Sequence, residues 1–135
     1  MKKIFFIFAY FILFIKPLFS YAKSEDFVVN GYRLVINANL SNADFFGRNL
    51  KGSNLSGCDL SFADLRFSNL TDVNLSFANL NGANLYGADL NGADLATAKL
   101  KGVYAKDLKR CPKALPIDWE CKKNELKEKK VVNIF

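Results

Sequence analysis

The strongest constraint on the fold of this chain is a five-residue repeat that runs from Ala38 to Gly102 without a phase slip. Its thirteen units share one pattern: a mostly small residue, then Asn or Asp, then Leu, then two variable residues. Only Phe45 replaces Leu at the third position, and only Lys99 replaces Asn or Asp at the second. Any fold for this segment must therefore give every fifth residue the same environment.

A period of five fits neither an α-helix, which repeats every 3.6 residues, nor a β-strand, which repeats every two. Leu at every fifth position is buried only if each unit forms one side of a coil and then turns. The turn falls on the two variable positions, and the second is Gly in seven units, which supplies the positive φ of a type II turn. Four successive units carry another residue there, and we expect a different turn geometry at these corners because non-glycine residues resist positive φ: Phe62, Phe67, Asp72 and Phe77.

The segment ANLNGANLYGADLNGADL (78–95) resembles the repeat signature of pentapeptide-repeat proteins. The resemblance implies an all-β fold, a right-handed quadrilateral β-helix with four units per coil and about three coils. In that fold each Leu stacks on the Leu four units away, so that the units together bury an apolar column that none of them buries alone. The same family implies a solenoid that binds partners or has a structural role.

The segments on either side of the repeat are expected to cap its two open ends. Residues 23–37 contain an Asn30-Gly31 turn between β-forming residues, which predicts a hairpin in an N-terminal cap. After Gly102 the five-residue phase is lost at Leu108, so residues 103–135 are predicted to form a C-terminal cap and a basic tail.

Three cysteines occur in the chain, and two of them flank a Pro-containing segment, CPKALPIDWEC (111–121). This segment resembles a C-terminal extension of exported pentapeptide-repeat proteins. We expect a Cys111–Cys121 disulfide in an oxidising compartment, with Leu115 and Trp119 over the end of the core. A two-cysteine metal site is the alternative, but no further ligands lie nearby in the sequence. Cys58 falls on an inward position and is expected to be a small core residue.

The N-terminal segment 1–22 has the three parts of a signal peptide. Lys2 and Lys3 precede an apolar run at 4–15, and Ser20-Tyr21-Ala22 provides small residues at the positions before a cleavage site. A membrane anchor is the alternative, but the run is shorter than the about 20 residues that span a bilayer. We therefore expect cleavage after Ala22, export to the periplasm or the medium, and no stable membrane span afterwards.

Composition excludes several kinds of chemistry. The chain has no His, which removes His-based triads, His general bases and His metal ligands. Asn and Asp recur in nearly every unit, so we expect them to form local hydrogen bonds in the repeat backbone and not paired catalytic carboxylates. The sequence therefore predicts no catalytic residue, no cofactor, no metal site and no enzymatic activity.

Charge is concentrated at the C-terminal end. The net charge of the chain is +6, and residues 105–135 carry nine Lys or Arg against five Asp or Glu. Such a tail either touches an anionic surface or is simply solvated, and we favour solvation because no aromatic residues alternate with the charges. Nucleic-acid binding is not expected.

The candidate interaction surface lies at one corner of the expected coil. Phe46, Arg66 and Tyr86 occupy the same place in every fourth unit, and Phe67 lies beside Arg66. Contiguous exposed aromatic residues often mark a protein interface; the alternative is that these rings only pack flat on their neighbours. We interpret the chain as a non-catalytic exported module that binds an unknown protein partner or associates with itself.

The family suggests one other function, because some pentapeptide-repeat proteins mimic DNA and bind type II topoisomerases. The predicted leader, the short rod and the absence of a strong negative field argue against this function here.

Overall fold

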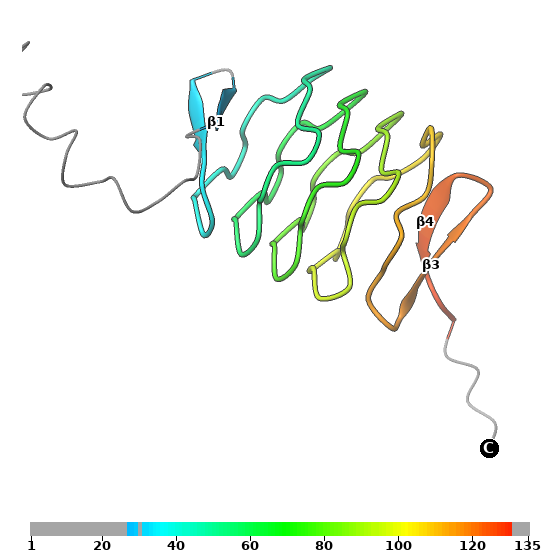
Figure 1. The fold of residues 1–135 in the computed structure, drawn as a ribbon. Helices are drawn as coiled ribbons and strands as arrows, with labels where there is room; N and C mark the ends of the chain where they lie inside the picture. Colours follow the sequence, from blue (N-terminus) through cyan, green and yellow to red (C-terminus); the bar gives the residue numbers. More distant parts are fainter. Residues whose placement is uncertain (1–26, 30, 131–135) are drawn as a thin grey trace, which may run out of the picture.

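The computed structural model describes residues 27–29 and 31–130. The expected leader (1–22), the first residues of the expected N-terminal cap and the final segment (131–135) lie outside the described residues. Two short hairpins flank a stack of coils, with β1 and β2 at one end and β3 and β4 at the other (Figure 1).

The repeat region forms a parallel β-helix in which each coil pairs with the next (Figure 1). The Asn/Asp position of a unit pairs with the same position four units later, as in the series Asn39, Asp59, Asn79. The amide of Leu40 donates to the carbonyl of Asp59 at 2.7 Å, and the amide of Asp59 donates to the carbonyl of Ala38 at 2.9 Å. One coil therefore contains four units, and we number the coils 38–57, 58–77, 78–97 and 98–117.

The interior of the coils is filled by the Leu position and the small position of each unit. The Leu side chains from Leu50 to Leu95 are fully buried, and so are the alanines at 43, 63, 78, 83, 88 and 93. Burying one Leu side chain stabilises the fold by about 1.5–3 kcal/mol relative to exposing it. Cys58 shares this environment, as expected from the repeat.

The four successive corners without glycine, at positions 62, 67, 72 and 77, use positive φ, as the glycine corners do. The glycines of the repeat have φ between 63° and 71°, and Phe62, Phe67, Asp72 and Phe77 have φ between 57° and 61°. The prediction of another geometry at these four corners is therefore wrong. Inter-coil hydrogen bonds hold these corners, for example from the Phe67 amide to the Tyr86 carbonyl at 2.9 Å. The ladder thus imposes the left-handed conformation, although a non-glycine residue there costs about 1–2 kcal/mol.

A hairpin closes the N-terminal side of the first coil. Strand β1 (Phe27–Val29) pairs in antiparallel register with β2 (Tyr32–Leu34). Leu34 is buried, and the ring of Tyr32 meets the buried ring of Phe45 edge to face at 5.2 Å between centroids. Phe45, the one residue that replaces Leu in the repeat, therefore contacts the hairpin.

The backbone ladder continues beyond Gly102, the end of the regular sequence repeat. Tyr104 pairs with Asn84, and Ala114 pairs with Asp94, both in the same register as the pairs of the earlier coils. Between them Asp89 pairs with Arg110, one position beyond this register, so the chain accommodates one extra residue and then returns to register. Leu108, which breaks the sequence phase, is buried in this fourth coil.

A second hairpin covers the C-terminal end of the core. Strand β3 (Trp119–Lys122) pairs with β4 (Glu125–Glu128), and Cys121 faces Leu126 across the pair. Leu126 is buried, and its amide donates to the carbonyl of Ala105 at 3.0 Å. Leu115 and Trp119 are partly buried against the core, as the sequence predicts.

The other side of this hairpin carries alternating charges. Because successive side chains of a strand point to opposite sides, Glu120 and Lys122 share a side with Glu125 and Lys127. Opposite charges face each other across the strands, and along each strand the ion pairs measure 2.9 Å and 2.8 Å.

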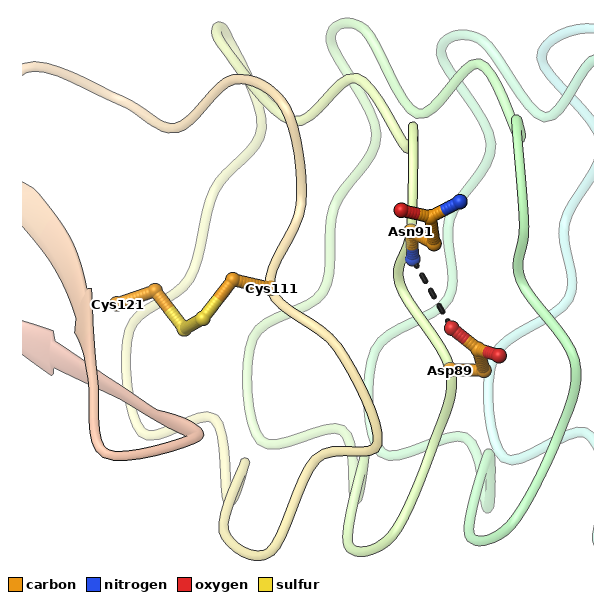
Figure 2. Close-up of a disulfide and its surroundings, with 4 residues drawn as sticks. All are labelled: Asp89, Asn91, Cys111 and Cys121. Atoms are coloured by element: carbon orange, nitrogen blue, oxygen red, sulfur yellow. Dashed lines mark hydrogen bonds between the residues drawn. A yellow bond between two sulfur atoms is a disulfide. The ribbon is translucent and has the colours of Figure 1, made fainter.

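A disulfide between Cys111 and Cys121 joins the fourth coil to β3 (Figure 2). This bond is the one that the sequence predicts. It closes a loop with a sequence separation of 10 and fixes the hairpin against the coil that it covers.

An ion pair holds the irregular part of the fourth coil. Asp89 is almost fully buried, and its carboxylate accepts hydrogen bonds from Arg110 at 3.0 Å (Nε) and 2.6 Å (Nη2). The same carboxylate accepts a bond from the backbone amide of Asn91 at 3.2 Å (Figure 2). The hydrogen bond to Arg110 lowers the pKa of Asp89, and the Asn91 amide adds to this effect.

We expect D89N to lower the melting temperature at pH 7 by at least about 4 °C, because it removes a charge-assisted bond. A carboxyl group with a lowered folded pKa contributes stability above its unfolded pKa of about 3.9, and this contribution is lost as the pH falls through the folded value. The difference between D89N and the natural protein should therefore shrink below about pH 4. Calorimetry of both proteins between about pH 2.5 and 7 measures the difference between their melting temperatures.

D94N is the matched control for D89N. Asp94 also accepts a bond from a backbone amide, that of Ala96, but its carboxylate lies 3.9 Å from the Lys113 ammonium. D94N should change the melting temperature little at any pH. If D89N and the natural protein melt alike at pH 7, Arg110 does not hold the fourth coil.

Candidate functional site

The candidate site lies at the corner that each coil forms at its second unit. The first turn position of this corner is occupied in succession by Phe46, Arg66, Tyr86 and Lys106. Backbone bonds fix their stacking: Gly47 donates to the Arg66 carbonyl at 2.8 Å, and Gly87 donates to the Lys106 carbonyl at 3.0 Å. The ladder that forms the fold therefore also sets the spacing of these side chains.

The structure brings the four predicted residues together and adds two more. The ring of Phe67 meets Phe46 at 5.6 Å and Tyr86 at 5.4 Å between centroids, both edge to face. Tyr86 in turn stacks on Tyr104 at 6.2 Å. The rings form one continuous strip across four coils, which we call the aromatic corner: Phe46, Arg66, Phe67, Tyr86, Tyr104 and Lys106.

The sequence did not identify Tyr104 and Lys106 as part of this surface. Tyr104 lies four units after Asn84, and Lys106 lies four units after Tyr86, so the register alone would have placed them there. The prediction ended the β-helix at Gly102, and these positions therefore fell outside it.

Two cations accompany the rings of the aromatic corner. The guanidinium carbon of Arg66 lies 5.1 Å from the centroid of Phe46, and the ammonium of Lys106 lies 5.7 Å from that of Tyr104. Arg66 also binds Asp64 in a bidentate manner, at 2.8 Å and 2.6 Å. This hydrogen bonding is the main cause that lowers the pKa of Asp64. Arg66 thus has an aromatic neighbour on one side, and the ring of Phe67, not Arg66, bridges to Tyr86.

The rings at two corners also pack on glycines of the next coil. A Cβ atom added to Gly87 would lie 2.6 Å from the ring of Phe67, and one added to Gly82 would lie 2.6 Å from Phe62. Packing on these glycines therefore buries part of the Phe67 and Phe62 rings. Phe67 nevertheless remains exposed to 45%, and Phe46 and Tyr104 on the same strip are each exposed to 47%.

The remaining chemical groups of the repeat have structural roles. The Asn/Asp side chains accept bonds from the amide two residues later, as Asp44 does from Phe46 at 3.0 Å, which confirms the predicted local hydrogen bonding. The Cys58 thiol lies 3.1 Å from the Val35 carbonyl, and burial raises its pKa, so it stays protonated at neutral pH.

The described part of the chain contains neither a cluster of metal-ligating side chains nor a membrane-spanning helix. Within residues 27–29 and 31–130, no three Cys, Asp or Glu side chains gather as metal ligands would. Over the same part of the chain, no helix has the length and hydrophobicity needed to cross a membrane.

Comparison with known proteins decides the family. The family model for pentapeptide repeats matches residues 38–76 and 68–104, with eight copies. The chain belongs to the pentapeptide-repeat family. Its coils, stacked through parallel β-bridges, are those of a right-handed β-helix, as the resemblance in the sequence implied. No curated protein matches the chain.

Solved pentapeptide-repeat structures resemble it over part of their length. One is HetL, which is involved in heterocyst differentiation regulation in the cyanobacterium Nostoc sp. strain PCC 7120. HetL is 33% identical, with a TM-score of 0.53, over 56% of this chain and 36% of HetL. Another is Rfr23 from the cyanobacterium Cyanothece 51142, 28% identical with a TM-score of 0.42, over 61% of this chain and 63% of Rfr23.

The packing of Phe67 on Gly87 can be tested by comparing G87A with G47A. Both glycines have positive φ, of 66° and 63°, but only the added methyl group at position 87 meets a ring. G47A should lower the free energy of unfolding by about 1–2 kcal/mol through backbone strain alone. G87A should lower it by about 1–3 kcal/mol more, because Phe67 must move. Urea denaturation measures both, and equal losses would show that Phe67 does not lie on Gly87.

Proposed function

We propose that this pentapeptide-repeat chain is an exported, non-catalytic binding module that recognises a protein through its aromatic corner. In this proposal the rod is a quadrilateral β-helix whose regular repeat supplies about three coils. The observation that carries the proposal is the continuous strip of rings from Phe46 to Tyr104, with Arg66 and Lys106 beside it; Phe46, Phe67 and Tyr104 are half-exposed, and Tyr86 is partly buried.

The composition and rigidity of this strip support protein binding. Aromatic residues and Arg are enriched in protein interfaces and dominate their binding energy. Here the backbone bonds of each coil hold the side chains in place before any partner arrives. Such preorganisation reduces the conformational entropy lost on binding.

A catalytic role finds no comparable support. The interior of the coils is filled mainly by Leu and Ala side chains, and burial raises the pKa of the Cys58 thiol, which also lies there. The ionisable side chains that lie close together are ion pairs, either within one unit, as Asp64 with Arg66, or between coils, as Asp89 with Arg110. We therefore propose a binding module and not an enzyme.

The regulatory role of HetL is not transferred to this chain, because the likeness covers only 36% of HetL. A DNA-mimicking role is also disfavoured. Residues 38–97 carry three Lys or Arg against six Asp or Glu, a weak negative charge, and residues 98–117 carry six against one. A surface whose sign changes along the rod does not imitate the uniform charge of duplex DNA.

Export can be tested on the full chain expressed in a bacterial host. If the leader is cleaved after Ala22, the protein recovered from the periplasm or the medium should begin at Lys23, and intact mass measurement will show it. An N-terminal segment retained on membrane-bound protein would instead favour the anchor. Recovery of the uncleaved chain from the cytoplasm would contradict export.

The binding surface can be tested by affinity capture from envelope and secreted fractions, with the exported protein as bait. A triple variant, F46S/F67S/Y86S, should lose the partner because it removes the central rings of the aromatic corner. The matched control is F62S/F77S, which removes two rings that are exposed to 68% and 70% at other corners. A partner retained equally by both variants would place the binding surface elsewhere.

A further inference from the structure

The first turn position of the aromatic corner alternates between aromatic and cationic residues from coil to coil. It holds Phe46 in the first coil, Arg66 in the second, Tyr86 in the third and Lys106 in the fourth. Gly47, Phe67 and Gly87 each donate a backbone bond to the carbonyl of this position in the next coil, which stacks the four residues in register. The order is therefore aromatic, cation, aromatic, cation along one edge of the rod.

A two-fold axis perpendicular to the rod reverses this order. Two copies related by such an axis lie antiparallel, so that the first coil of one faces the fourth coil of the other and the second faces the third. Phe46 then faces Lys106 of the second copy, and Arg66 faces Tyr86 of the second copy. A parallel pair would place each cation against its own counterpart, which is repulsive.

We propose that the aromatic corner binds a second copy of this chain, in an antiparallel two-fold pair. This inference rests on the proposed function, in which the aromatic corner is the binding surface, and it names the partner. Each aromatic ring in the first turn position meets a cation of the other copy, and each such contact occurs twice in the pair.

The geometry of the cations agrees with this arrangement. Arg66 has its own-chain contact with Phe46 and Lys106 with Tyr104, yet their side chains remain exposed to 43% and 53%. A ring from the second copy completes an aromatic–cation–aromatic sandwich around each of them. Cation–π contacts gain strength when they are removed from water in this way.

Phe67 lies where the two-fold axis would pass. Its ring covers Gly87 and therefore sits at the junction of the second and third coils, which is the midpoint of the strip. A residue at a two-fold axis meets its own counterpart. The two half-exposed Phe67 rings would thus pack on each other and provide the apolar centre of the interface.

The charge distribution along the rod also favours the antiparallel arrangement of the two copies. The first three coils (38–97) have a net charge of −3, from three Lys or Arg and six Asp or Glu. The fourth coil (98–117) has a net charge of +5, from six Lys or Arg and one acidic residue, Asp107. Parallel copies place the two fourth coils, each +5, side by side, whereas antiparallel copies place each fourth coil beside a first coil whose net charge is only +1, from Asp44, Arg48 and Lys51.

The interface is small, so the pair is expected to be weak and reversible. Four coils at about 4.8 Å give a strip about 19 Å long. A strip of this length buries less surface than the about 1,200–2,000 Å² of stable complexes. We expect a monomer–dimer equilibrium with a Kd of roughly 10–100 µM.

Sedimentation equilibrium of the protein recovered after export tests the proposal with a matched pair of variants, F46K and F46E. Both remove the same ring and differ only in charge. F46K places a lysine opposite Lys106 and should weaken the dimer roughly tenfold or more. F46E places a carboxylate opposite Lys106 and should keep the dimer within about threefold of the natural Kd. Two equally weakened variants, or the opposite order, would overturn the antiparallel register.

A mixture of two variants gives a second readout. K106E alone should also weaken self-association, because each dimer then loses both of the Lys106 ammonium groups that face Phe46 of the other copy. F46K and K106E mixed in equal amounts should restore a dimer, since the lysine introduced at position 46 then faces the glutamate introduced at position 106. Failure of the mixture to associate, with both variants folded by circular dichroism, would contradict the pairing of the first coil with the fourth.

The remaining controls separate this inference from the proposed function. F67S should abolish dimerisation, and F77S at another corner should leave it unchanged; a dimer insensitive to F67S uses a different surface. If the natural protein stays monomeric up to about 500 µM, five times the weakest expected Kd, the second copy is excluded as the partner. In that case the capture experiment still decides whether the aromatic corner binds another protein.

Discussion

The structure depends on one interaction, the parallel backbone ladder that joins each unit of a coil to the unit four places further on. Leu40 bonds to Asp59, and the same exchange recurs from the first coil to the fourth. Because the ladder is continuous, it fixes the corners even where the sequence opposes it. Phe62, Phe67 and Phe77 adopt the left-handed conformation that glycine prefers, and the fold tolerates this strain because hydrogen bonds and buried Leu side chains on both sides over-determine the backbone.

Most of this architecture could be predicted from the repeat, and the parts that could not be predicted have a common origin. A period of five with Leu at its centre is enough to indicate a coil with inward Leu and a turn in each unit. The sequence could not show that one extra residue near Lys109 would let the ladder regain its register at Ala114. For the same reason it missed Tyr104 and Lys106, which belong to the aromatic corner only once a fourth coil exists. The sequence pattern shows where the regular repeat ends, but the β-helix continues as long as its backbone groups find hydrogen-bonding partners in the preceding coil.

The backbone ladder also determines which side chains meet at the aromatic corner. Side chains on successive coils are held a few ångströms apart by the ladder, so a surface on this fold is a column of positions drawn from every fourth unit. The column at the second corner combines rings and cations whose contacts the structure shows, from Arg66 over Phe46 to Tyr86 on Tyr104. Sequence register therefore predicted the neighbours correctly, whereas the edge-to-face contacts of Phe67 depend on ring orientations that no sequence pattern specifies.

The C-terminal hairpin has a consequence for how such rods can assemble. A parallel β-helix is in principle a polymer without a defined length, because its last coil offers the same unpaired backbone groups as every coil before it. Here β3 and β4 cover the last coil, and the disulfide between Cys111 and Cys121 fixes them in place. The side of the hairpin that faces away from Leu126 carries ion pairs between Glu and Lys residues. End-to-end growth at this terminus would have to displace a covalently fixed lid and desolvate four charges. Fibre formation along the axis is thus blocked at this end, and lateral contacts through the sides of the rod are the route left open for association there.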